Sequence, residues 1–277
     1  MTQSKTQPKG RVLIIAGSDS GGGAGLQADI KTITMLGGYA MNAVTAVTVQ
    51  NTLGVSGVHE IPPEIVRAQI EAVISDLGAD AWKLGMLGSA AHVRAVRAAY
   101  EAVGAGVPLV LDPVMIAKGG AALLAEDAVA VIRDELVPLA AIVTPNAPEA
   151  EALTGVSVRD LDGQMEAAEV LVEQLGAYSA LVKGGHIEGA VVRDVLLTRE
   201  GYRVFESERI ETRATHGTGC TLASAIAAYM AQGVAIEPAV EAARAYLIEA
   251  IRHAPGLGAG HGPLGHNWAF PRGHTLV

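Results

Sequence analysis

The stretch ETRATHGTGCTLASAIAA, residues 211–228, predicts a glycine-rich turn that runs directly into an alanine-rich helix. We expect the helix to begin near Thr218 or Cys220. Its first backbone N–H groups have no partner within the helix, and with the positive end of the helix dipole they form a site for an anion, most often a phosphate. Gly217 and Gly219 would let that anion approach the backbone. The stretch therefore offers a candidate phosphate site, beside the alternative of an ordinary turn.

Cys220 is the single cysteine of the chain and falls in the first turn of this helix. The field of the helix end should favour its thiolate, which would make the side chain a base or a nucleophile. A lone cysteine in an alanine-rich helix is more often a small buried hydrophobic residue, and Gly-Thr-Gly is often only a turn. Both interpretations stay open at this point.

Composition narrows the class of protein. The chain has 277 residues, half of them hydrophobic, with 33 glycines and few aromatics, which suits many tight strand-to-helix turns. The net charge of −9 gives no electrostatic footprint for nucleic acid or an anionic membrane, and no apolar run approaches a membrane span. One cysteine excludes an intramolecular disulfide, and the polar start MTQSKTQPKG lacks the apolar core of a signal peptide. We expect a cytoplasmic protein.

Apolar runs alternate along the chain with segments of helical periodicity. Strands are expected at 12–16, 42–50, 82–87, 107–111, 142–143 and 180–186, an antiparallel hairpin at 191–198 and 202–210, and helices at 26–36, 62–77, 89–103, 122–136, 162–175, from about 218, and 238–254. No repeat or linker divides this series, so we expect one domain over 11–268, between a disordered tail at 1–10 and a C-terminal tail at 269–277. Such a series requires a mostly parallel sheet with helices on both faces.

Polar residues gather where the predicted strands end. Ligands of such sheets bind outside the carboxyl ends of the strands. That edge should collect the 17–25 loop GSDSGGGAG, Gln50, Met86, Asp112, Asn146, Lys183 and the Cys220 turn. A lysine, two carboxylates and an anion-binding helix end suit phosphoryl transfer, because positioning and charge stabilisation supply nearly all of that catalysis. Asn146 is equally suited to be a helix N-cap, and Gln50 to belong to a turn.

Three other sites are disfavoured. Gly23, Gly25 and Ala28 fit a relaxed dinucleotide-binding pattern, but no acidic residue follows about 20 positions on to hold a ribose. The Walker pattern of the ordinary P-loop is absent from the sequence. His261 and His266 have no common metal-site spacing, and we expect them to serve the C-terminal loop.

Seven blocks in order make the chain recognisable. It resembles the ribokinase-like superfamily, specifically the hydroxymethylpyrimidine/phosphomethylpyrimidine kinases of thiamine biosynthesis, over about residues 11–268. The blocks are AGSDSGGGAGLQADIKT, AVTVQNT, KLGML, LDPVM, TPNAPEA, VKGGH and THGTGCTLASA. The resemblance implies a ribokinase-like three-layer α/β/α sandwich with a mostly parallel central sheet in a single domain.

The resemblance also implies roles for individual residues. The glycine loop with Gly17, and Gln50, would hold an aminopyrimidine, since an amide offers a donor and an acceptor to a ring nitrogen beside an amino group. Asp29 would bind near the substrate, and Met86 and Val114 would line its pocket. By the same resemblance, Lys183 would contact the phosphates of the nucleotide. Asn146, Glu149 and Asp112 would organise Mg²⁺ and phosphate, with Asp112 and Glu149 holding the metal indirectly. The anion hole would consist of Gly217, Thr218 and Gly219.

The implied reactions transfer phosphate from ATP to 4-amino-5-hydroxymethyl-2-methylpyrimidine, and then from ATP to the monophosphate to give the diphosphate. Cys220 takes the place of the aspartate base of the sugar kinases. The second reaction attacks with a phosphate oxygen that is already ionised and needs no base. Mg²⁺ is the implied cofactor, and a homodimer the implied assembly, without nucleic acid or membrane partners.

Two alternatives remain from the sequence. Pyridoxal kinases with a cysteine in this motif share much of the pattern, so pyridoxal is the alternative substrate. The 17–25 loop carries Ser20-Gly21 where some relatives have Pro-Ser, which would alter a lid without altering the chemistry.

A nucleotide-binding regulatory protein that lost turnover is the second alternative and belongs to another class of protein. ATP hydrolysis that depends on a pyrimidine would distinguish the kinase from it.

Overall fold

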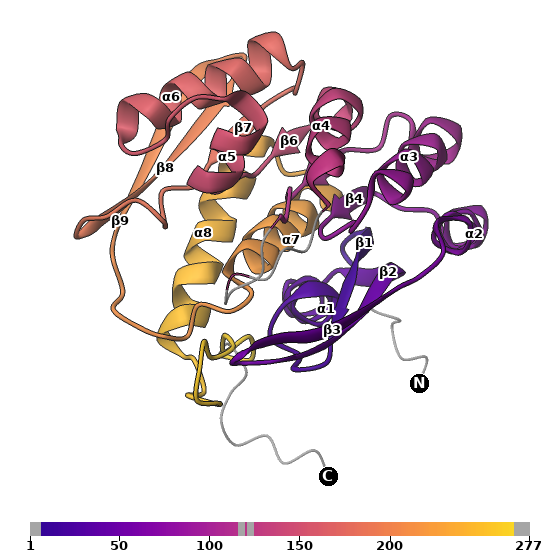
Figure 1. Cartoon of the computed structure of the whole chain (residues 1–277), viewed down its shortest axis with the longest axis horizontal. Helices are drawn as coiled ribbons and strands as arrows, with labels where there is room; N and C mark the ends of the chain where they lie inside the picture. Colours follow the sequence, from indigo (N-terminus) through magenta and orange to yellow (C-terminus); the bar gives the residue numbers. More distant parts are fainter. Residues whose placement is uncertain (1–6, 116–119, 121–124, 269–277) are drawn as a thin grey trace, which may run out of the picture.

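A sheet in the order β3-β2-β1-β4-β5-β6-β7-β8-β9 organises the molecule (Figure 1). The structure is a computed structural model that describes residues 7–115, 120 and 125–268. Within these residues the strands are β1 (Arg11–Asp19), β2 (Tyr39–Asn51), β3 (Gly54–Glu60), β4 (Ala81–Leu84), β5 (Leu109–Leu111), β6 (Ile142–Val143), β7 (Ala180–Val182), β8 (Val191–Thr198) and β9 (Gly201–Glu208).

The six neighbouring strands β2-β1-β4-β5-β6-β7 are parallel, while β3, β8 and β9 pair antiparallel with their neighbours. The β8–β9 hairpin and the β2–β3 ribbon lie at opposite ends of the molecule (Figure 1). From β1 the chain goes to β2 on one side, and the later parallel strands build up on the other side of β1. The carboxyl ends of β1 and β4 thus form the switch point at which sheets of this kind bind ligands.

Helices cover both faces of this sheet. They are α1 (Gly25–Met35), α2 (Pro63–Asp76), α3 (Ala90–Ala99), α4 (Glu126–Glu135), α5 (Ala147–Thr154), α6 (Leu161–Glu169), α7 (Thr218–Ala231) and α8 (Ile236–Arg252). Five-residue π-helical turns extend α3 and α6 at Tyr100–Gly104 and Val170–Gln174, and a short 3₁₀ turn at Val137–Leu139 follows α4.

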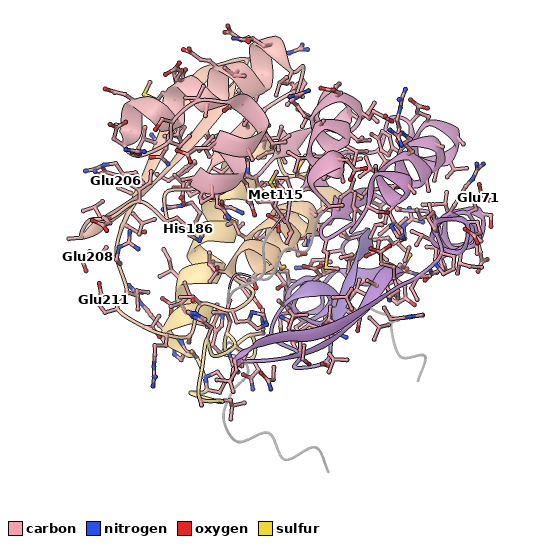
Figure 2. All side chains as sticks on the ribbon, in the orientation of Figure 1. Glu71, Met115, His186, Glu206, Glu208 and Glu211 are labelled. Carbon is pink, nitrogen blue, oxygen red and sulfur yellow. The ribbon has the colours of Figure 1, made fainter. Side chains whose placement is uncertain are left out.

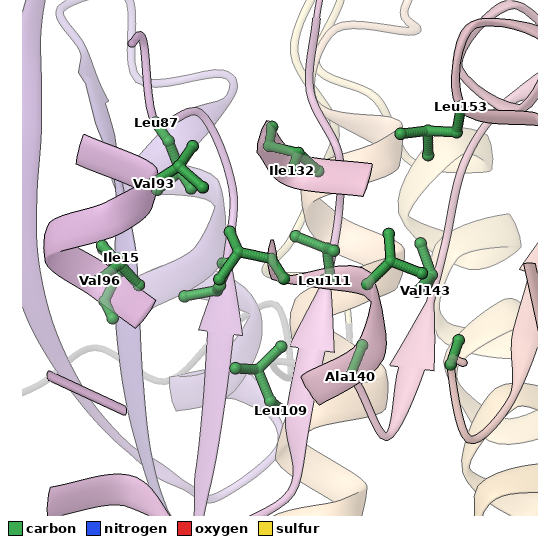
Figure 3. Packing of buried hydrophobic residues seen from close by; sticks show 14 of the residues in the cluster. Ile15, Leu87, Val93, Val96, Leu109, Leu111, Ile132, Ala140, Val143 and Leu153 are labelled. Atoms are coloured by element: carbon green, nitrogen blue, oxygen red, sulfur yellow. The ribbon is translucent and has the colours of Figure 1, made fainter. Parts of the chain in front are cut away.

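Alternation along β1 shows why the layers form. Successive side chains of a strand point to opposite faces. Leu13 and Ile15 pack with residues of α2 to α6 (Figure 3), whereas Val12 and Ile14 pack with residues of α1, α7 and α8. Because β1 is buried on both faces, it reads as a continuous apolar run. The three-layer α/β/α fold expected from the sequence is confirmed.

β3 was not expected from the sequence, and β4 and β7 are shorter than the strands expected at 82–87 and 180–186. β3 has no buried face, so its residues lack the apolar alternation that identifies a half-buried strand. Residues 85–87 are mostly apolar and buried, yet they leave the sheet after Leu84. The apolar side chains of residues 85–87 are explained by their burial and not by pairing in the sheet.

The predicted helix starts differ in detail from the structure. α7 begins at Thr218 as predicted, and α8 begins at Ile236, just before Pro238. Ser89 stands at the N-cap of α3, but its hydroxyl makes no capping bond and lies 2.8 Å from Nδ1 of His92. Ser89 therefore marks the start of α3 as expected, but its hydroxyl contacts a histidine side chain instead of capping the helix.

At the N-terminus, the backbone N–H of Lys9 donates to Gly37 and the carbonyl of Gly10 accepts from Tyr39. These two residues of the expected 1–10 tail are therefore held at the α1–β2 corner. The rest of that tail through residue 6, the start of the helix expected at 122–136, and the tail at 269–277 lie outside the described residues. In the part of the chain that the structure describes, no helix is long and apolar enough to cross a membrane.

Candidate active site

A cavity of about 580 Å³ runs along the carboxyl ends of the parallel strands. This volume falls in the range of small-molecule sites, roughly 300 to 1,000 Å³. Figure 2 labels two of its lining residues near the middle of the molecule, Met115 after β5 and His186 after β7. Most of the candidate residues expected from the sequence line it: Gly17, Gln50, Met86, Asp112, Val114, Asn146, Glu149, Lys183, Gly217, Thr218, Gly219 and Cys220.

The N-terminus of α7 opens into this cavity. Gly217 precedes the helix in the left-handed conformation, with φ of 84°, and a Cβ there would collide with the carbonyl of Gly23. A Cβ on Gly219 would lie 3.3 Å from Nζ of Lys183 and 3.6 Å from Oδ2 of Asp112. Two glycines thus bring the glycine loop, the helix end and a lysine–carboxylate pair together, as an anion site requires.

Lys183 and Asp112 form that pair, with Nζ 3.0 Å from Oδ1 of Asp112 and 4.0 Å from Oε2 of Glu149. Burial would lower the pKa of Lys183, but Asp112 and then Glu149 outweigh it and raise the pKa above its usual value. The ammonium group therefore keeps its charge. Oδ2 of Asp112 is buried without a hydrogen-bond partner among the described residues, so the pair has an acceptor left for a ligand.

Asn146 and Glu149 form a capping box at the start of α5. The Asn146 side chain accepts from the Glu149 N–H at 3.0 Å, and the Glu149 carboxylate accepts from the Asn146 N–H at 2.8 Å. The N-cap alternative for Asn146 is correct, and the cap turns Glu149 towards Lys183. Burial, joined by Asp112 and opposed by Lys183, raises the pKa of Glu149 to about 7.

Cys220 departs from the sequence prediction. Burial raises the pKa of its thiol to about 12, and the carboxylates of Asp29 and Asp112 add to the rise against the opposing effects of Lys83 and the Gly25 N–H. The helix end, equivalent to about half a positive charge, does not offset the loss of water. The expectation of a favoured thiolate is wrong for the chain without its ligands.

Asp29 is the candidate residue that does not line the cavity. Both of its oxygens lie close to Nζ of Lys83, at 2.9 and 3.1 Å, and Ser224 donates to it at 2.7 Å. Asp29 and Lys83 are fully buried. Lys83 itself lines the cavity, so Asp29 stands directly behind a lining residue without lining the cavity itself.

Asp19 and His216 belong to the site, although the sequence analysis did not single them out. Asp19 ends β1 and accepts backbone N–H groups from Gly21, Gly23 and Ala24 at 2.8 to 2.9 Å. His216 Nε2 lies 2.9 Å from Oδ2 of Asp19. Their signals were visible as the one acidic residue of the glycine loop and the histidine of THGTGC, but only the fold shows that they meet.

The opposite end of the cavity is apolar and was also missed. Val192, Ile210, Leu247, Ile248 and Ile251 line it from β8, the segment after β9, and α8. Arg209 fixes the adjoining turn, because its guanidinium donates to the carbonyls of Gly185, Ile187 and Gly189. Glu206, Glu208 and Glu211 follow the outer edge of this end in Figure 2. No local spacing in the sequence joins these segments.

The C-terminal loop packs against the end of β2. The His261 N–H donates to the Thr52 carbonyl at 2.8 Å. His266 is buried beside the hydroxyls of Thr32 and Tyr246, at 3.4 and 3.3 Å, and burial lowers its pKa to about 4. Among residues 7–115, 120 and 125–268, no three His, Cys, Asp or Glu side chains gather as a metal site. The contacts of both histidines are those of loop packing.

Comparison with known proteins agrees with this geometry. A family model described as phosphomethylpyrimidine kinase matches residues 19–265. The hydroxymethylpyrimidine/phosphomethylpyrimidine kinase of Bacillus subtilis is 47% identical over 263 residues, which cover 95% of this chain and 96% of that protein. The thiamine biosynthesis bifunctional protein ThiED of Geobacter sulfurreducens is 50% identical over 259 residues, 94% of this chain, but the match spans only 52% of that longer protein.

Solved structures give the same family and fold. A phosphomethylpyrimidine kinase from Clostridium difficile has a TM-score of 0.77 and 40% identity, covering 87% of this chain and 99% of that one. An ADP complex of Bacillus subtilis pyridoxal kinase has a TM-score of 0.86 and 35% identity, covering 93% and 97%. The sequence similarity and the ribokinase-like fold agree, and the chain belongs to the phosphomethylpyrimidine kinase family of phosphotransferases.

Proposed function

We propose that this chain uses ATP to phosphorylate 4-amino-5-hydroxymethyl-2-methylpyrimidine to its monophosphate, and then to phosphorylate the monophosphate to the diphosphate. The observation that carries the proposal is the meeting of the α7 N-terminus with the Lys183–Asp112 pair inside one cavity. Backbone N–H groups and an ammonium group there stabilise the charge of a phosphoryl group in transfer.

The pyrimidine would bind at the β1–β4 end of the cavity. Gln50 supplies an amide, and Met86 and Val114 supply apolar contacts. A Cβ on Gly17 would lie only 3.1 Å from Sδ of Met86, so glycine keeps room beside the ring. The adenine of ATP would occupy the apolar end at β8 and α8. Complexes of neighbouring kinases with ADP and with AMP-PCP support ATP as the co-substrate.

Cys220 would accept the proton of the substrate hydroxyl in the first reaction. With a pKa of about 12 its thiol is protonated near neutral pH, so the reactive thiolate is a small fraction that grows with pH. The second reaction uses an ionised phosphate oxygen as nucleophile and needs no base. Both reactions depend on Lys183 and the N–H groups of Gly219 and its neighbours to hold the transferred group in line.

Mg²⁺ fits the carboxylates at this point. The buried Oδ2 of Asp112 has no partner among the described residues, and Glu149 adds a second oxygen donor at the cavity wall. Mg²⁺ prefers oxygen ligands and usually keeps several waters, so Asp112 and Glu149 would hold it through water or phosphate. When bound, the ion neutralises charge on the phosphates of the nucleotide.

Three other properties stay proposals. Pyridoxal is the weaker substrate candidate, because the curated kinases of 46 to 50% identity are named for the pyrimidine or for thiamine biosynthesis, whereas the pyridoxal kinases are 31 to 35% identical. A homodimer remains the proposed assembly, and exposed Val47 and Val49 on β2 offer an apolar surface for it. The cytoplasm is the proposed location.

A substrate panel tests the function. Purified protein with Mg·ATP is incubated with the hydroxymethylpyrimidine, its monophosphate or pyridoxal, and the products are identified by mass. We expect two successive phosphate additions to the pyrimidine and weak or no product from pyridoxal. Fast turnover of pyridoxal with no pyrimidine diphosphate would favour the vitamin B6 kinase instead.

A further inference from the structure

A chain of polar contacts crosses the β1–β2 end of the cavity, from Asp19 through His216 and Gln50 to Thr48. Gln50 Nε2 lies 3.0 Å from His216 Nε2, and Gln50 Oε1 lies 3.2 Å from the Thr48 hydroxyl. Because the nitrogen and oxygen of an amide occupy equivalent positions after a half-turn of the group, the hydrogen bonds around Gln50 decide which atom stands where.

The Asp19 end places a proton on His216. The carboxylate accepts three backbone N–H groups and lies 2.9 Å from His216 Nε2. Although burial opposes ionisation, the His216 bond and the N–H groups of Ala24 and Gly21 keep the pKa of Asp19 below its usual value. An ionised carboxylate only accepts hydrogen bonds, so His216 Nε2 must be the donor. A protonated Nε2 has no lone pair with which to accept from a Gln50 NH₂ group, whereas a Gln50 oxygen can share the Nε2 hydrogen with Asp19. The Gln50 atom beside that nitrogen is therefore the oxygen.

The Thr48 end gives the same answer independently. The Thr48 hydroxyl lies 3.0 Å from the Ser18 carbonyl oxygen, which can only accept. The hydroxyl has a single hydrogen, so both contacts are made in full only if that hydrogen goes to Ser18 and the hydroxyl oxygen accepts from Gln50. The Gln50 atom that satisfies this arrangement is the donating nitrogen.

We propose that Asp19 and His216 are positioning residues that fix the Gln50 amide with its carbonyl towards His216 and its NH₂ group towards Thr48. The opposite orientation would set two donors together at His216 and would leave one Thr48 hydrogen for two acceptors, the Ser18 carbonyl and the Gln50 oxygen, in a half-buried place. Asp19 thus sets the amide orientation through the proton that it holds on His216.

The fixed amide selects a chemical class of ligand. Gln50 lines the cavity, and its remaining N–H and remaining lone pair bind a ring nitrogen beside an exocyclic amine in only one order. This specificity step rests on the proposed function, since it takes the aminopyrimidine as the ligand. The orientation of the amide itself does not depend on that assignment.

The first test reads the proton directly. Long-range ¹H–¹⁵N NMR on the ¹⁵N-labelled full chain reports the protonation of each ring nitrogen of its eight histidines, and loss of one signal set in His216→Phe assigns His216. We expect a protonated Nε2 on His216 that persists in Gln50→Leu. An unprotonated Nε2 would overturn the proposal without any assumption about substrate.

The second test separates binding from turnover. His216→Phe and Asp19→Asn should each raise the KM for the pyrimidine about ten-fold, while the KM for ATP changes by less than about two-fold. His59→Phe is the control, because His59 is exposed on β3 and does not line the cavity. An unchanged pyrimidine KM in both variants, with a raised one in Gln50→Leu, would contradict the proposal. If the wild-type chain does not phosphorylate the pyrimidine, the proposed function fails, and the NMR result alone decides the positioning role.

Discussion

Two lysine–carboxylate pairs reach the same cavity and differ in how completely their hydrogen-bonding groups are satisfied. In the Lys83–Asp29 pair both side chains are fully buried, and Ser224 completes the carboxylate. In the Lys183–Asp112 pair the lysine side chain is 12% exposed and one oxygen of Asp112 is left without a partner among the described residues. We call them the closed pair and the open pair.

This difference suits the closed pair to a structural role and the open pair to ligand binding. The closed pair joins β4, α1 and α7, so it fixes the elements from which Gly25 and Cys220 project. Each oxygen of Asp29 has a hydrogen-bond partner, so the pair has no unpartnered carboxylate oxygen to offer a substrate. The open pair stands at the N-terminus of α7 with a free acceptor and a third charged group, Glu149, 4.0 Å away. The two pairs have the same residue types, but only the open pair is partly exposed and leaves a carboxylate oxygen without a partner among the described residues.

Cys220 is sensitive to both pairs, because Lys83 lowers its pKa while Asp29 and Asp112 raise it. We expect Cys220→Ala to slow phosphorylation of the alcohol by about 10² to 10⁴-fold, the range for a positioned general base. The second phosphorylation should keep most of its rate. Since the thiol pKa is raised to about 12, thiolate is scarce at neutral pH and increases about ten-fold per pH unit below that value.

The pH profile of kcat/KM for the alcohol should therefore rise through the alkaline range in the wild-type enzyme and flatten in Cys220→Ala. Steady-state kinetics from pH 7 to pH 10 on both substrates measure this. Equal rates for the alcohol in the two proteins would mean that Cys220 is a helix residue without a catalytic role.

Breaking the closed pair should affect stability most. Lys83→Met leaves the Asp29 charge buried without its cation, and we expect a loss of about 3 to 5 kcal/mol in the free energy of unfolding. Lys83→Met with Asp29→Asn removes both charges and should recover much of this loss. Denaturant unfolding of both proteins checks the order. If the single variant is as stable as the wild type, the closed pair does not hold α1 and α7.

Breaking the open pair should mainly affect catalysis. Lys183→Met removes one charged donor from the transferred phosphoryl group, and kcat should fall by about 10² to 10³-fold, as for loss of one oxyanion donor. Its stability should fall less than that of Lys83→Met, because Asp112 lines the cavity and water can reach the vacated position. Comparison of kcat and unfolding free energy between the two lysine variants tests the distinction directly. A larger stability loss in Lys183→Met would reverse it.

The contrast between the pairs also shows what the sequence could predict. Apolar runs along β1, β5 and β6 identified the parallel sheet, since strands buried on both faces leave an unbroken apolar signal. The order of the elements then predicted that Asp112, Asn146 and Lys183 would share one edge. These inferences depend on local periodicity and on one general rule of parallel sheets.

What the sequence could not predict depends on contacts between distant segments. In the sequence Lys83 is a single polar residue within an apolar run, and its partner Asp29 is 54 positions away. His216 and Asp19 are 197 positions apart. The protonation of Cys220 required knowledge of burial, which the helix-end argument did not contain. The strand ends and the rule for parallel sheets thus placed Asp112 and Lys183 of the open pair at one edge, but nothing in the sequence joined the two members of the closed pair.

The smallest expected effect concerns Glu149, the charged group beside the open pair, in the chain without ligand. Burial raises the pKa of Glu149 from its usual 4.5 to about 7. A carboxyl whose pKa is higher in the folded state contributes stability that is fully present below pH 4.5 and lost as the pH rises through 7. Above pH 7 the ionised group therefore costs about 3 kcal/mol, at about 1.4 kcal/mol per unit of pKa.

Glu149→Gln removes this cost and keeps the capping box, because glutamine also accepts from the Asn146 N–H. At pH 8 the ligand-free variant should melt about 5 to 10 °C above the wild type, whereas at pH 4, where the wild-type carboxyl is mostly protonated in both the folded and the unfolded state, the two should melt together. Glu166→Gln, an exposed position on α6, is the matched control and should change little at either pH. The same stabilisation at both pH values would mean that packing, not the charge of Glu149, is responsible. A gain confined to high pH, together with loss of kinase activity, would show that Glu149 is held in an unfavourable state for the sake of its ligand.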